Sequence, residues 1–219
     1  KTAAVVIELV QAESGITPAN YKFIEQLKNK CTQHNALLII DEIQTGFGRT
    51  GTLFAFEKYN VVPDILCIAK GMGGGLPIGA FIANKTHMDC FTNQPVLGHI
   101  NTFGGNAVCL AAAQACLEII IDEQLVANSI KIEKIISDKF SNINSLKCTV
   151  VGAFAALEFK TQLINFEVIK QCLLNGIITD WFLFNDKALR ICPPLNINEI
   201  ELKDTLEKLA DIISQVKTN

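Results

Sequence analysis

The chain has 219 residues, 49% of them apolar and 19% charged, a profile typical of a soluble globular protein with a sizeable core. The formal net charge of -3 and the pI near 5.7 exclude the basic surface that nucleic acid or an anionic membrane would need. No apolar run approaches the roughly 20 residues of a membrane-spanning helix. Residues 1–8 lack a signal-peptide core and are typical of a buried strand, so we expect the chain to begin within a domain as part of a longer protein.

The first 122 residues alternate strand-like and helix-like segments. Thr17 and Pro18 predict an N-cap and a first helical residue, followed by a helix with one apolar face (Tyr21, Ile24, Leu27 and Cys31). Strands are predicted at residues 3–9, 36–40, 64–69 and 78–83. They are apolar on both faces and separated by crossovers, which predicts an α/β sheet covered by helices on both sides.

The pattern changes after residue 105. Helices are predicted at 107–121, 124–140 and 163–174, and short strands at 155–159 and 188–192. A last helix starts at Asn198, with Glu201 completing a capping box and a core stripe of Leu202, Leu206, Leu209 and Ile213. We therefore predict a large-domain portion over 1–122 and a small α+β domain over 123–219.

The cysteines predict neither disulfides nor a metal site. All eight are scattered without a CxxC pair, and only three histidines accompany them. Several lie in apolar periodic segments, where cysteine behaves as a small hydrophobic residue. We expect reduced thiols in a cytoplasmic protein.

Two ionisable residues follow buried strands. Asp41 ends the strand at 36–40, and Lys70 ends the strand at 64–69. Singly, each is as well explained as a turn-capping acid or a solvated lysine. Together they predict an acid and an amine aimed at one ligand, because ligands bind at the carboxyl ends of strands in open α/β sheets.

Two glycine-rich stretches need different interpretations. Residues 71–77, GMGGGLP, permit positive φ and the close approach of a bulky group. Residues 46–51 match G-x-G-x-x-G, but four residues separate the match from its strand and no clear helix follows. A dinucleotide site is therefore not predicted.

Three segments together resemble the class III (ornithine/acetylornithine-type) aminotransferases. They are residues 38–51 (LIIDEIQTGFGRTG), residues 63–79 (PDILCIAKGMGGGLPIG) and residues 102–106 (TFGGN) before an alanine-rich helix. The resemblance implies the pyridoxal 5'-phosphate (PLP)-dependent transferase fold type I, the aspartate-aminotransferase-like fold, with a truncated large domain. It also implies that an N-terminal part, carrying a phosphate loop and a ring-stacking aromatic, lies outside this chain.

The resemblance also implies roles for six residues. Lys70 would hold PLP as a Schiff base and shuttle a proton, and Asp41 would keep the pyridine nitrogen protonated. Gln44 would bond the phenolic oxygen of the cofactor, and Thr102 would reach the phosphate of a neighbouring subunit in a homodimer. For the substrate, Arg190 would grip an α-carboxylate and Glu13 would pair with Arg190 when the substrate presents an ω-amine.

The reaction implied is transfer of an ω-amino group from an ornithine- or acetylornithine-like donor to 2-oxoglutarate. Glu8, Arg49, Asp64 and Asn106 are interpreted as structural. Alternatives remain: an aminomutase or decarboxylase on the same fold, which would share Lys70 and Asp41, or a non-catalytic subunit. A nicotinamide oxidoreductase rests only on the weak glycine match. Residues 181–184, WFLF, line either a pocket or a core.

Overall fold

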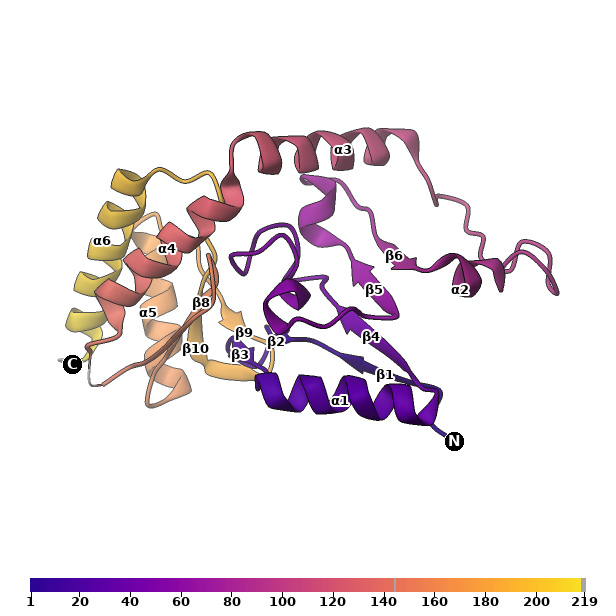
Figure 1. The fold of residues 1–219 in the computed structure, drawn as a ribbon. Helices are drawn as coiled ribbons and strands as arrows, with labels where there is room; N and C mark the ends of the chain where they lie inside the picture. The colour runs from indigo at the N-terminus through magenta and orange to yellow at the C-terminus, as the bar shows by residue number, and fades with distance from the viewer. Residues whose placement is uncertain (144, 218–219) are drawn as a thin grey trace. The chain divides into compact units, whose positions relative to one another are not determined.

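The chain folds as two compact units in the computed structural model, which describes residues 1–143 and 145–217 (Figure 1). Unit 1 comprises Lys1–Leu9, Ala19–Phe47 and Phe54–Glu123. Unit 2 comprises Val10–Pro18, Gly48–Leu53 and the residues from Gln124 onward. The change of unit after Glu123 lies one residue beyond the sequence boundary at 122. Two short segments within the first 122 residues fold with unit 2.

Unit 1 is built on a sheet with the strand order β1-β4-β5-β6. Neighbours β1, β4 and β5 run parallel, and β6 runs antiparallel to β5. All four predicted strands are present, within two residues of the expected limits: β1 (Ala4–Ile7), β4 (Leu37–Asp41), β5 (Ile65–Ile68) and β6 (Ala80–Ala83). Alternate residues of β4 and β5 are fully or nearly buried, as expected for central strands.

Helix α1 (Tyr21–His34) begins later than predicted. Its N-cap is Asn20, whose side chain accepts hydrogen bonds from the backbone N–H groups of the second and third helical residues at 2.9 and 3.3 Å. The predicted cap at Thr17 and Pro18 is wrong, because this dipeptide forms the short strand β3 (Thr17–Pro18), paired with β2 (Val10–Gln11). The fixed φ of proline is compatible with an extended segment and with the first turn of a helix. Pro18 therefore could not distinguish a strand from a helix start.

The remaining helical segments of unit 1 are η1 (Ala55–Tyr59), η2 (Lys70–Gly73), α2 (Lys85–Asp89) and α3 (Ala107–Asp122). Helix α3 approaches η2 closely. The Cys116 thiol lies 3.2 Å from the Gly71 carbonyl oxygen, and a Cβ on Gly74 would lie 3.2 Å from the Cys116 Cβ. The bulky group that the glycine run admits is therefore, in part, helix α3.

Unit 2 contains an antiparallel sheet with the order β7-β8-β10-β9. Its strands are β7 (Lys147–Val150), β8 (Ala155–Glu158), β9 (Trp181–Phe182) and β10 (Asn185–Ile191), and its helices are α4 (Leu125–Phe140), α5 (Gln162–Leu174) and α6 (Glu199–Lys217). The three helices share one apolar core with the sheet. The predicted α6 stripe is confirmed, since all four of its residues are 2 or 3% exposed, and Asn198 accepts from the Glu201 N–H at 2.8 Å. No helix within the described residues combines the length and apolarity needed to cross a membrane.

Arg49 joins three segments of unit 2, which confirms its structural interpretation. Its Nη1 donates to the carbonyl oxygens of Ala153 at 2.9 Å and Pro193 at 2.7 Å. Its own carbonyl oxygen accepts from the Ser129 hydroxyl at 3.2 Å and from the Ala153 N–H at 2.9 Å. Gly152 lies against this backbone with φ of +62°, and a Cβ there would lie 2.4 Å from the Arg49 oxygen.

Gly152 and Gly176 offer a matched test of this packing. Both have positive φ, but a Cβ on Gly176 would meet nothing within 4 Å. We expect Gly176→Ala to lower the free energy of unfolding by about 1 kcal/mol through backbone strain alone. Gly152→Ala should cost at least about 2 kcal/mol more, because the methyl group collides with backbone. Urea unfolding of both variants measures the difference, and equal losses would contradict the packing described here.

Candidate active site

Asp41 and Lys70 stand at the carboxyl ends of two neighbouring parallel strands. Asp41 is the last residue of β4 and is paired in register with Cys67 of β5, and Lys70 follows β5 by two residues. Asp41 is half-buried, and its Oδ1 accepts from the Ile43 N–H at 2.9 Å. Burial raises the pKa of the Cys67 thiol, and the charge of Asp41 raises it further. The structure thus brings the predicted acid and amine to one edge of the sheet.

Lys70 has an unusual backbone conformation. It opens η2 with φ of +44°, in the left-handed region that non-glycine residues rarely adopt, and its side chain is exposed. Such strain persists only where the surrounding structure imposes it, and it gathers at functional sites. An exposed amine and a half-buried carboxylate at neighbouring strand ends are groups that could bind PLP covalently and pair with its pyridine nitrogen, so these residues fit the cofactor.

Gln44 lies in a tight turn organised by Glu42, a residue that the sequence reasoning missed. The Glu42 carboxylate is fully buried and accepts from the N–H groups of Ala55 at 3.0 Å and Phe56 at 2.8 Å, and from the Thr45 hydroxyl. Burial raises the Glu42 pKa, although these three donors oppose the rise. The sequence does contain a sign of this role, because Glu42 directly follows Asp41 and Thr45 lies three residues further on, within reach of the Glu42 carboxylate.

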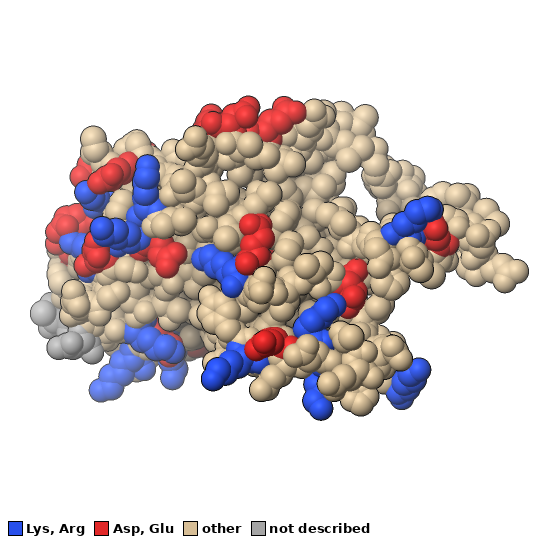
Figure 2. Space-filling view, viewed as in Figure 1, with Lys and Arg blue, Asp and Glu red and all other residues tan. Residues whose placement is uncertain are grey.

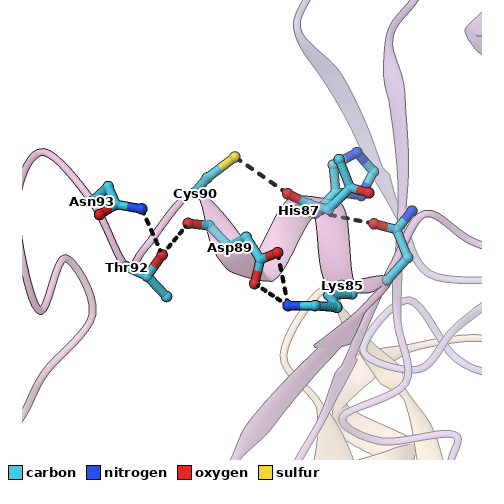
Figure 3. A network of polar contacts seen from close by, with 8 residues as sticks. Lys85, His87, Asp89, Cys90, Thr92 and Asn93 are labelled. Atoms are coloured by element: carbon cyan, nitrogen blue, oxygen red, sulfur yellow. Dashed lines mark hydrogen bonds and ion pairs between the residues drawn. The ribbon is translucent and has the colours of Figure 1, made fainter.

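Thr102 lies on a different kind of segment. It is exposed, in the connection between α2 and α3, and not at a strand end. At the start of this connection, Lys85 pairs with Asp89 at 2.9 Å and the Thr92 hydroxyl donates to the Asp89 carbonyl oxygen at 2.7 Å, in an exposed local network (Figure 3). The far end of the connection is fixed by Asn106, which caps α3, so the predicted structural role of Asn106 is confirmed.

Glu13 and Arg190 form a half-buried ion pair within unit 2. Arg190 Nη2 lies 2.9 Å from Glu13 Oε2 and 3.1 Å from Oε1, and the side chains are 24% and 22% exposed. The Leu183 N–H also donates to Glu13 Oε2, at 2.9 Å. The Arg190 guanidinium lies over the Phe182 ring, 4.7 Å from its centroid, a cation–π contact that orients it. The predicted pair is therefore formed.

Residues 181–184 divide between core and surface. Phe182 is fully buried beside Phe154, whereas Leu183 and Phe184 are 70% and 78% exposed. Trp181 packs edge-on against Phe166 and lines an apolar hollow of about 590 Å³ together with helix α5. Both sequence interpretations of this run thus hold, for different residues.

Asp64 confirms its structural interpretation in unit 1. Its carboxylate accepts from the Leu38 N–H at 2.7 Å and pairs with Lys28 at 3.1 Å. Although burial acts to raise the Asp64 pKa, the Leu38 and Lys28 hydrogen bonds outweigh burial and lower it. This pairing ties α1 to the start of β5, at the opposite end of that strand from Lys70.

Comparison with known proteins places this geometry in a family. The family described as aminotransferase class III matches residues 1–213. The chain is 35% identical over 216 residues to an acetylornithine aminotransferase of Clostridium acetobutylicum, covering 94% of this chain and 53% of that protein. It is 34% identical to a succinylornithine transaminase of Citrobacter koseri, covering 99% and 54%. The solved ornithine aminotransferase of Plasmodium yoelii superposes with a TM-score of 0.86 at 29% identity, covering 97% and 57%.

The fold is therefore that of the PLP-dependent transferases of fold type I. Within that class, the chain belongs to the class III aminotransferase family, whose members use PLP. The chain spans about half the length of the curated relatives it matches.

Glu42 gives a testable contribution to stability. Glu42→Ala removes three hydrogen bonds and leaves the buried Ala55 N–H and the half-buried Phe56 N–H without this acceptor, so we expect a loss of about 3 kcal/mol in the free energy of unfolding. Glu57→Ala is the control, because the exposed Glu57 carboxylate caps only the Phe54 N–H at 2.7 Å and should contribute about 1 kcal/mol or less. Chemical denaturation measures both, and a similar loss in the two variants would contradict the role assigned to Glu42.

Proposed function

We propose that this chain, within its complete protein, catalyses PLP-dependent transamination of an ω-amino group from an ornithine- or acetylornithine-like donor to 2-oxoglutarate. The observation that carries the proposal is the placement of Asp41 and Lys70 at adjacent strand ends, with Gln44 three residues beyond Asp41. Names of relatives, which include acetylornithine, succinylornithine and putrescine aminotransferases, support an ω-amine donor.

Each cofactor-binding residue has one task in this proposal. When bound, PLP supplies an electron sink that acidifies the substrate C–H next to nitrogen. Lys70 would hold the cofactor covalently through its side-chain amine, and the same amine would move a proton to and from the substrate carbon. Asp41 keeps the proton on the pyridine nitrogen, because an adjacent anion stabilises the cationic form. Gln44 donates to the phenolic oxygen.

Arg190 and Glu13 would sort the two substrates. With the ion pair closed, the Arg190 charge is neutralised and the site accepts a substrate end that lacks a carboxylate. With the pair open, Arg190 grips the α-carboxylate of glutamate or 2-oxoglutarate. An aminomutase or decarboxylase would not need this switch, which favours transamination over those alternatives.

A homodimer is part of the proposal. Thr102 would bind the cofactor phosphate of the second subunit, and its surroundings suit an interface. Between Asp89 and Glu118 the sequence has no Lys, Arg, Asp or Glu, and Figure 2 shows α3 free of charged side chains except toward its C-terminal end. Ile100 and Phe103, beside Thr102, are 73% and 82% exposed. Apolar exposure of this extent marks protein contacts.

The proposed compartment is the cytoplasm. All eight cysteines have free thiols, including the exposed Cys90 and Cys192, as a reducing environment would keep them.

Borohydride trapping tests the cofactor assignment. The complete protein that contains this chain is purified with PLP, reduced and mapped by peptide mass spectrometry. We expect the pyridoxyl group on Lys70, whose exposed amine begins η2. Lys70→Ala should lose the label and reduce turnover by at least about 100-fold. Lys58, in η1 of the same unit, provides the control substitution. A label on another lysine, or no label, would leave the non-catalytic subunit as the better account.

Arg190→Lys tests the carboxylate assignment. Lysine keeps the charge but loses the planar fork of donors, so the KM for 2-oxoglutarate should rise about tenfold or more while the KM for the amine donor changes little. Arg49→Lys, at the chain's other arginine, should instead lower the melting temperature and leave both KM values unchanged. Steady-state kinetics of both variants decide the assignment. Equal effects on the two substrates would refute selective recognition by Arg190.

A further inference from the structure

The turn between β9 and β10 directs two amides at one residue. Phe182 pairs with Asn185 across the hairpin, so Leu183 and Phe184 form its two-residue turn. The Leu183 N–H donates to the Glu13 carboxylate at 2.9 Å, and the Phe184 N–H donates to the Glu13 carbonyl oxygen at 3.0 Å. The turn therefore holds both the backbone and the side chain of Glu13.

Arg190 contacts Glu13 through a single nitrogen. Nη2 serves both carboxylate oxygens and also lies 3.3 Å from the Trp181 carbonyl oxygen. The buried Nε of Arg190 has no hydrogen-bond partner within the residues that the structure describes. A forked pair, with two nitrogens each donating to one oxygen, is the stronger arrangement. The closed pair thus lacks this forked geometry, and its guanidinium would gain a hydrogen bond by turning to a carboxylate that offers it.

Opening such a pair is normally expensive. Removing one partner of a half-buried ion pair leaves the other charge with little compensation. An anion released from Arg190 would also repel a second anion arriving there. A second donor that keeps hold of the Glu13 carboxylate reduces both penalties, and the Leu183 N–H already donates to it in the closed state.

We propose that the Leu183 main-chain amide is a positioning group that retains Glu13 when Arg190 turns to a substrate carboxylate. Phe182 is compatible with the same motion. Its buried ring contacts the face of the guanidinium, and this contact does not depend on which carboxylate the guanidinium pairs with. This inference rests on the proposed function, in which Arg190 alternates between Glu13 and substrate. The inference adds the Leu183 amide, which would keep Glu13 in place so that Arg190 can pair with it again after the substrate leaves.

Leu183→Pro removes the N–H and puts the ring Cδ in its place, so the Glu13 carboxylate must leave this amide. Neither turn residue has a positive φ, and proline favours the first central position of turns. The preceding Phe182 is in a strand, the conformation that a following proline requires. Leu183→Ala is the matched control, since it shortens the same exposed side chain and keeps the N–H. Any effect common to both variants belongs to the side chain.

In the complete enzyme loaded with PLP, the proline variant should raise the KM for 2-oxoglutarate about five- to tenfold over the alanine variant. The KM for the amine donor should stay within about twofold, because that complex keeps the pair closed. The dissociation constant of glutarate, an unreactive dicarboxylate, should rise with the KM for 2-oxoglutarate when measured by calorimetry. These shifts should vanish in a Glu13→Ala background, because the amide acts only through Glu13.

Three outcomes would overturn the inference: equal KM values in the proline and alanine variants, equal rises for donor and acceptor, or persistence of the effect without Glu13. If the proline variant does not fold, an ester in place of the peptide bond between residues 182 and 183 removes the same N–H without the ring. A wild-type enzyme that fails to transaminate would refute the proposed function itself, whereas an active enzyme indifferent to the amide would refute only this inference.

Discussion

The parallel pairing of β4 with β5 is the constraint on which the proposed chemistry depends. Its register sets Ile39 opposite Ile65 and Asp41 opposite Cys67, so both strands leave the apolar interior at the same edge. Slippage of this register by one residue would turn the buried residues of either strand toward the other face. The site thus derives its geometry from burial of the strands, and Glu42 then fixes the turn that follows.

Unit 2 holds the Glu13–Arg190 ion pair, whose arginine would change partners in the proposed function. Arg190 is carried by β10, a strand held on both sides, while Glu13 comes from the short excursion between β2 and β3. A guanidinium between a buried ring and a half-buried carboxylate is oriented but not locked, because its contact with Glu13 uses one nitrogen. Firm support for the acid, beside a guanidinium that can turn, would suit the exchange of carboxylates in the proposed function.

The sequence predicted the structure best where burial of apolar side chains alone determined the conformation. Buried apolar runs predicted the sheet strands, and helical periodicity predicted the α6 stripe, because burial of these residues leaves little choice of conformation. It failed at Thr17 and Pro18, since proline suits extended and helical starts equally. Glu42 and the Leu183 amide were not predictable in the same way. Their partners lie 13 and 170 residues away, and a backbone N–H leaves no mark in a sequence.

The uncharged stretch between Asp89 and Glu118 connects the fold with the proposed assembly. Val108 and Leu110 of α3 are 68% and 47% exposed, and apolar exposure of this kind in water carries a free-energy cost that burial would recover. Asn106 caps α3 at the C-terminal end of the connection that carries Thr102. In the proposed homodimer, a second subunit at Thr102 would bury these apolar side chains and receive a hydroxyl for its cofactor, so that dimerisation and cofactor binding would stabilise one another.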